Sequence, residues 1–201
     1  MPTKALTSCA LLLTASVTTA AAQGAPPAQG AGGGQRGGGR GPSGPGLTLT
    51  TTAFPDGGEI PAKFAGADGV SPKLEWSNVP ANTATFALIM HDPDVALQRR
   101  NDDVLHWMMF NIPGTSRGLP EGMPAAGQMS DGTVQAMNLR KALGYMGPGA
   151  SAAGPHHHYT FELFALDTKL ELMPDATRAD VLKAMDGHIL GKGVLVGRFH
   201  Q

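Results

Sequence analysis

Short apolar segments with a two-residue period recur between Leu47 and Phe199, and proline or glycine separates them. The clearest are "LTLTTTAF" at 47–54, "TFALIMHD" at 85–92, "HWMMFNIP" at 106–113, "HHHYTFELFALD" at 156–167 and "GVLVGRF" at 193–199. Alternation of this kind is typical of β-strands that pack on a core, and proline and glycine are typical of the loops between them. The sequence therefore predicts a mainly β domain.

A single segment has a convincing helical pattern, "DATRADVLKAMDG" at 175–187. We expect Asp175 or Thr177 to cap its first turn and Gly187 to end it. The residues expected on its apolar face are Val181, Leu182 and Met185.

Residues 1–22 have the pattern of a secretory signal peptide. An early Lys4 is followed by an apolar run at 10–17 and by a small-residue ending around Ala20 and Ala22. A membrane-spanning helix would need about 20 apolar residues, and threonine and serine interrupt this shorter run. We therefore predict cleavage near residue 23 and a periplasmic or secreted protein with no integral membrane span in its mature form.

The next segment, 23–46, is rich in glycine and proline and offers almost nothing to bury, so we expect a flexible linker. The folded domain is then predicted over 47–201. Cys9 is the only cysteine and lies in the predicted signal peptide, so the mature chain would have no disulfide.

The charge of the predicted domain argues against nucleic acid as a partner. Lys4, Arg36 and Arg40 are three of the chain's 15 basic side chains, and none of its 16 acidic ones precedes Asp56. The remainder therefore has a formal net charge of about −4, whereas binding to a phosphate backbone depends on clustered basic residues.

Three predicted strands each have a polar residue at one end of an apolar face. By the two-residue period, Asp92 continues the face of Phe86, Leu88 and Met90, and His91 points away. The same rule puts His106 with Met108, Phe110 and Ile112, opposite Trp107, Met109 and Asn111. It also puts His157 with Tyr159, Phe161, Leu163 and Ala165.

If these strand ends meet, Asp92, His106 and His157 form the polar floor of an apolar pocket. A carboxylate beside two imidazoles favours protonated imidazole, which can donate to a phosphate or carboxylate oxygen. Backbone amides of the glycine-rich loop near Gly147 would add donors. The expected ligand is a small anion or a phosphorylated head group.

Two other uses of these residues stay open. Asp92, His106 and His157 also form a two-histidine, one-carboxylate set of the kind that binds metal ions, and His156 could chelate with His158 at the surface. For catalysis, "GASAAG" around 151 lacks the G-x-S-x-G pattern, and neither a P-loop nor an H-E-x-x-H motif is present. General acid–base use of Asp92 and His106 remains an option, but we expect no enzyme, no cofactor and no resident metal.

Seven blocks of the sequence occur in the order found in a known family. They are "AFPDGGEIPAKF", "SPKLEWSNVP", "LIMHDPD", "HWMMFNIP", "GYMGP", "HHHYTFELFALD" and "DGHILGKGVLVGRF". In these blocks the chain resembles the phosphatidylethanolamine-binding proteins (PEBP), in the bacterial branch called Raf kinase inhibitor-like. The resemblance implies antiparallel β-sheets in Greek-key order, a few peripheral helices and a small anion-binding cavity at the sheet ends.

The resemblance also implies site residues and partners. By position, the ligand-binding residues would be Asp92 and Asp94 of a D-P-D motif, His106, Gly147 and Pro148 of a G-P loop, and His157 and Tyr159. Members bind phosphate-bearing head groups, usually without enzymatic activity. The alternative that the family suggests is an inhibitor of a protein kinase or protease, and bacterial members are often homodimers.

This sequence departs from the family pattern near the expected cavity. Ala96 replaces a proline of the D-P-D-A-P motif, and the charged segment "LQRRNDD" is inserted at 97–103. His158 takes the place of the family's usual arginine. We expect these differences to change the rim of the cavity and the choice of ligand.

Overall fold

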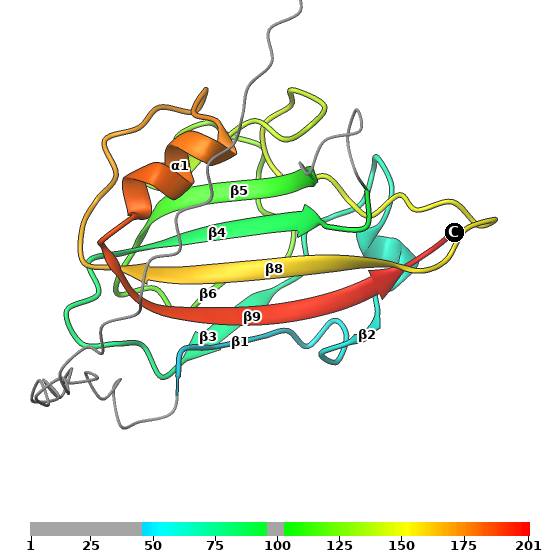
Figure 1. Cartoon of the computed structure of the whole chain (residues 1–201), viewed down its shortest axis with the longest axis horizontal. Coiled ribbons are helices and arrows are strands. Elements are labelled where there is room, and N and C mark those ends of the chain that lie inside the picture. Colours follow the sequence, from blue (N-terminus) through cyan, green and yellow to red (C-terminus); the bar gives the residue numbers. More distant parts are fainter. Residues whose placement is uncertain (1–45, 96–102) are drawn as a thin grey trace, which may run out of the picture. The chain divides into compact units, whose positions relative to one another are not determined.

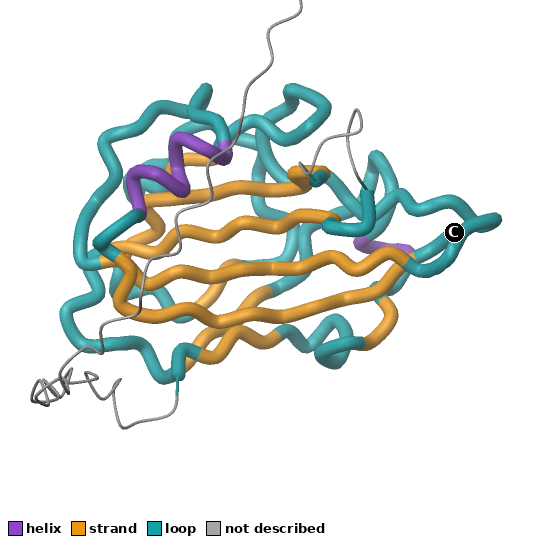
Figure 2. The backbone as a smooth tube through the Cα atoms, in the orientation of Figure 1, coloured by secondary structure: helices purple, strands orange, loops and turns teal. Residues whose placement is uncertain are grey.

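The computed structural model describes residues 46–95 and 103–201. The predicted signal peptide, the predicted linker before Gly46, and Ala96 lie outside these ranges. Over the described residues the chain is mainly β, as predicted, with the strands arranged in two sheets (Figures 1 and 2).

The larger sheet has six strands. In spatial order they are β2 (Gly58–Glu59), β9 (Ile189–Phe199), β8 (His157–Leu166), β4 (Thr85–Asp92), β5 (Val104–Pro113) and β7 (Val134–Gln135). All neighbours are antiparallel except β2 and β9, which are parallel, so this sheet is mixed rather than purely antiparallel. The smaller sheet has the order β1 (Thr48–Thr50), β3 (Leu74–Ser77) and β6 (Gly118–Leu119).

The larger sheet has an apolar core on each face. One core lies between the two sheets and contains Leu88 and Met90 of β4, Phe161 of β8 and Trp76 of β3. The other core includes Ile89 of β4 and packs under the helix α1 (Arg178–Met185). The alternation predicted for β4 is therefore confirmed, and burial on both faces explains why all eight of its residues are buried.

The strict alternation predicted for β5 is wrong at two places. Met90 pairs with Trp107 but the next residue, His91, pairs with Leu105, so His106 is an extra residue in a β-bulge. A second register shift lies near Asn111, whose φ is 57°. Between the two shifts the prediction holds, since Met108 and Phe110 face the helix and Trp107 and Met109 face the core between the sheets. Beyond the second shift, Ile112 joins the core between the sheets instead of the face of Met108 and Phe110.

The helix α1 begins at the predicted cap. The Thr177 side chain accepts a hydrogen bond from the Asp180 N–H, and the Asp180 carboxylate accepts one from the Thr177 N–H, which forms a capping box. Val181 and Met185, four residues apart, are fully buried. Leu182 is 41% exposed, contrary to the prediction, because one residue turns about 100° around the helix axis.

One other helical element completes the described fold. A short 3₁₀ helix, η1 (Ala62–Phe64), lies close to the glycine-rich loop, since Gly66 N–H donates to Pro148 O at 2.7 Å. Among residues 46–95 and 103–201, no helix is long and apolar enough to cross a membrane.

Candidate functional site

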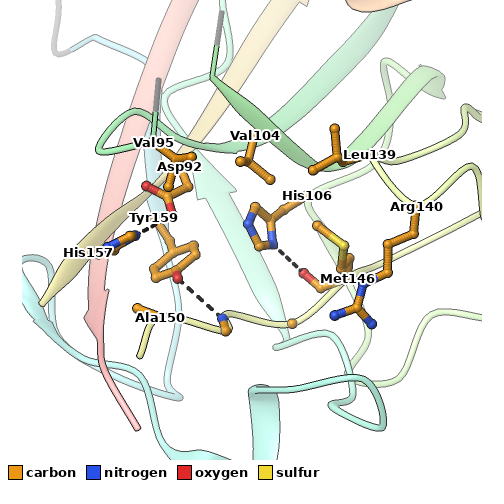
Figure 3. Close-up of a pocket in the computed structure, with 12 residues that line it drawn as sticks. Asp92, Val95, Val104, His106, Leu139, Arg140, Met146, Ala150, His157 and Tyr159 are labelled. Atoms are coloured by element: carbon orange, nitrogen blue, oxygen red, sulfur yellow. Dashed lines mark hydrogen bonds and ion pairs between the residues drawn. The ribbon is translucent and has the colours of Figure 1, made fainter. Parts of the chain in front are cut away.

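A pocket of about 220 Å³ lies where β4 ends and β5 and β8 begin (Figure 3). Asp92 reaches it from β4, His106 from β5, and His157 and Tyr159 from β8. These ends meet because β5 and β8 both run antiparallel to β4, so their first residues lie beside its last. The three polar strand ends identified in the sequence therefore line one cavity.

Asp92 orients His157. Asp92 is 3% exposed, and its Oδ2 lies 2.7 Å from His157 Nδ1. Its Oδ1 accepts a hydrogen bond from the Asp94 N–H at 2.9 Å. Both carboxylate oxygens thus have protein partners, and no described residue hydrogen-bonds His157 Nε2, which remains available to a ligand.

His106 is held in a defined tautomer. Its Nδ1 lies 2.8 Å from Met146 O, and a carbonyl can only accept, so Nδ1 donates the proton. In the neutral ring, Nε2 is then an acceptor. Its ring meets that of Tyr159 edge-on, with 5.0 Å between centroids.

The charge on His106 differs from the expectation. Burial lowers its pKa, although the bond to Met146 and the charge of Asp92 act in the opposite direction. The protonated imidazole predicted at this position is therefore wrong for the ligand-free protein at neutral pH.

Tyr159 is 1% exposed and carries a protonated hydroxyl. Burial raises its pKa to about 12, and the nearby Asp92 carboxylate acts in the same direction. Its oxygen accepts a hydrogen bond from Gly149 N–H at 3.3 Å, so its own proton can be donated either to the nearby Asp92 carboxylate or to an acceptor in the pocket.

Arg140 brings a cation to the pocket. This arginine was not among the site residues predicted from the sequence. It lines the cavity together with Leu139 and Met146, within a loop of no regular period. Backbone bonds fix this loop, since Leu139 N–H donates to Leu105 O and Met146 N–H to His106 O, both at 3.0 Å. The only sequence signal was its proximity to the "GYMGP" block.

The remaining predicted site residues divide between the pocket and its surroundings. Gly147 lines the pocket. Pro148 is buried but does not line the pocket. Its carbonyl accepts a hydrogen bond from the Gly66 N–H. Asp94 is also outside the lining, because its Oδ2 accepts from His158 N–H at 2.6 Å and lies 3.0 Å from His158 Nδ1. Burial acts to raise the pKa of Asp94, but these bonds to His158 lower it overall.

The geometry does not favour a metal ion between the three residues that suggested one. Asp92, His106 and His157 do not form a set of ligand atoms within 4.8 Å of one another. Instead the pocket offers the hydroxyl of Tyr159, the free nitrogen of His157 and the guanidinium of Arg140. Such a set can surround a group with several acceptor oxygens.

Comparison with known proteins relates this chain and its fold to one family. A family model described as phosphatidylethanolamine-binding protein matches residues 50–200. A UPF0098 protein of Methanothermobacter thermautotrophicus is 42% identical over 156 residues, which cover 77% of this chain and 99% of that protein.

Two crystal structures have the same architecture. A homologue of the family from Chlamydia trachomatis, CT736, is 34% identical with a TM-score of 0.66, and the match covers 78% of this chain and 98% of that one. Escherichia coli YbcL, described as a member of the mammalian PEBP family, is 25% identical with a TM-score of 0.67, over 78% and 99% of the two chains.

Proposed function

Because this chain belongs to the phosphatidylethanolamine-binding protein family, we propose that its pocket binds a small phosphate-type or carboxylate-type anion, free or as a phosphorylated head group. The observation that carries this proposal is the convergence of His106, His157, Tyr159 and Arg140 on one cavity. Its volume of about 220 Å³ is below the range of about 300–1,000 Å³ typical of drug-sized ligands. A head group or inorganic anion suits this size.

The polar groups favour an anion even though one of them is a carboxylate. Both oxygens of Asp92 already accept protein hydrogen bonds, so its main role is to orient His157. Arg140 supplies a permanent positive charge and Tyr159 a hydroxyl donor. When an anion enters, its charge favours the protonated form of His106, which then becomes a further donor.

We propose binding without turnover. The twelve residues that line the described pocket include no serine, cysteine or lysine. These are common nucleophiles of covalent catalysis, and the sequence has no nucleophile motif. Among the other candidates in the lining, Asp92 already accepts hydrogen bonds through both of its oxygens. The signal-peptide pattern at 1–22 supports placing this binding protein outside the cytoplasm.

Calorimetric titration with inorganic phosphate and with phosphoethanolamine tests the proposed ligand class. We expect binding to disappear in the His106→Ala/His157→Ala double variant. Arg140→Gln should weaken binding by at least about tenfold, since a hydrogen bond to a charged group contributes roughly 1.5–3 kcal/mol. The control is Arg117→Gln, because Arg117 is exposed, bonds to Gly114 O and does not line the pocket. Wild-type affinity in the double variant would contradict the proposal.

The same variants address the predicted kinase or protease inhibition. Inhibition that survives the double variant would act through the outer surface, and inhibition that disappears would act through the pocket. The inhibitor role stays a prediction, as does the homodimer.

The affinity for an anion should rise as the pH falls through the titration of His106. Its pKa lies below the ordinary value of 6.5 in the free pocket, and a bound anion raises it, so binding takes up a proton. Affinity should increase by up to about tenfold per pH unit between the free and bound pKa values, and it should level off outside them.

Sulfate is the suitable probe for this pH dependence, because its charge is constant over the range. The same cavity is also lined by Asp92, His157, Tyr159 and Arg140. The slope of affinity against pH must therefore be assigned to His106 by substitution. His106→Gln should flatten the titration measured by calorimetry between pH 5 and 8. An unchanged slope in that variant would exclude His106 as its origin.

A further inference from the structure

A second group of ligand-type side chains lies at one corner of the larger sheet, apart from the pocket. It consists of Glu59 in β2, His156 just before β8 and His200 just after β9. One ligand atom from each side chain lies within 4.8 Å of the others. The two imidazole rings are close, with 3.9 Å between centroids and 45° between planes.

The strand register brings these residues together. β2 runs parallel to β9, with Glu59 opposite Arg198, and β8 runs antiparallel to β9, with His157 opposite Phe199. The residue before His157 and the residue after Phe199 therefore lie beside each other, next to the end of β2. Backbone bonds hold the corner, since Ile60 N–H donates to Arg198 O at 2.8 Å and Gln201 N–H to Ala150 O at 3.1 Å.

One nitrogen in this group lacks a partner. His200 Nδ1 is buried and makes no hydrogen bond within the described part of the chain. A buried polar atom without a partner is unfavourable, and a metal ion is a partner that imidazole commonly takes. Glu59 is exposed, so its carboxylate can rotate toward the two rings.

We propose that Glu59, His156 and His200 bind a divalent transition-metal ion of the zinc or copper kind. Two imidazole nitrogens and one carboxylate oxygen suit these ions, whereas magnesium and calcium prefer ligand sets made only of oxygen. Three protein ligands at about 2 Å leave a further position for water in a tetrahedral site.

The structure changes the partner that the sequence suggested for His156. The histidine tract at 156–158 pointed to chelation between His156 and His158, which share one side of an extended chain. His158 instead bonds to Asp94, and the partner of His156 is His200 from the far end of β9. His157 faces the anion pocket, so the tract serves separate sites.

Titration of the full chain, purified without a histidine tag and treated with a chelator, tests this site. We expect ZnCl₂ and CuCl₂, added separately at pH 7.5, each to bind with one ion per chain by calorimetry and to raise the melting temperature. An ion that binds only the folded state stabilises it by mass action. MgCl₂ should give neither effect.

Three substitutions assign the ligands. His156→Ala and His200→Ala should each weaken zinc binding by at least about tenfold, and Glu59→Gln should weaken it without disturbing the fold because Glu59 is exposed. His158→Ala is the matched control from the same tract and should bind zinc as the wild type does. Wild-type binding in the His156→Ala/His200→Ala double variant, or loss of binding in His158→Ala, would overturn the proposal.

Discussion

An Asp103→Ala variant should lose about 3 kcal/mol of unfolding free energy, because Asp103 is the shared acid of a largely buried ionic group. Its Oδ2 lies 2.6 Å from His91 Nδ1, and its Oδ1 pairs with Arg178 Nη1 of α1. The three side chains are only 17%, 11% and 27% exposed. Truncation of Asp103 leaves Arg178 without an acidic partner among the described residues. Urea denaturation measures the resulting loss of unfolding free energy.

Asp167→Ala is the matched control for this prediction. Asp167 Oδ1 also lies close to a histidine, 2.8 Å from His188 Nδ1, but the two side chains are 43% and 47% exposed. Water screens such a pair, so its loss should cost less than about 1 kcal/mol. Equal losses in the two variants would show that the buried group contributes no more than a surface pair.

Gly147→Ala should be destabilising and should also weaken anion binding. A Cβ at this position would lie 2.6 Å from Gly66 O and 2.7 Å from Phe64 O, and both atoms belong to the backbone. The loop must then move, at a cost of about 1–3 kcal/mol. Because the neighbouring Met146 O holds His106, the movement should reach the pocket.

Gly149→Ala is the control for Gly147→Ala, because it replaces a glycine of the same loop without creating a close contact. Gly149 also lines the pocket, but a Cβ there would meet no atom within 4 Å. Thermal unfolding of this variant should match the wild type to within about 0.5 kcal/mol. If Gly147→Ala is equally harmless, the close contact between the loop and η1 is not a constraint on the fold.

The elements with strong periodicity were predictable from the sequence. β4 spans the expected residues 85–92, β8 has its predicted inward face, and α1 is capped by Thr177, one of the two residues expected there. The convergence of Asp92, His106 and His157 could be predicted as well, because antiparallel pairing brings the polar ends of β4, β5 and β8 to one edge. The family that the sequence resembles is confirmed by comparison.

The features that could not be predicted depend on contacts between distant segments. The bulge at His106 is a matter of register with β4, so a two-residue period within β5 cannot reveal it. The wall of the pocket that contains Arg140, residues 136–146, has no hydrophobic period that would predict a strand or a helix. The meeting of His156 with His200 depends on the pairing of β8 with β9.

The wall that contains Arg140 has a consequence for ligand selection. Between residues 136 and 146 it is bonded to the edge of β5, where Ala136, Leu139 and Met146 each donate a backbone N–H at 3.0 Å. The conformational entropy of this segment is therefore lost when the chain folds, and a ligand would not have to order it on binding. Under the proposed function, this ordered wall should favour small ligands, since widening the recess on that side would break backbone hydrogen bonds to β5.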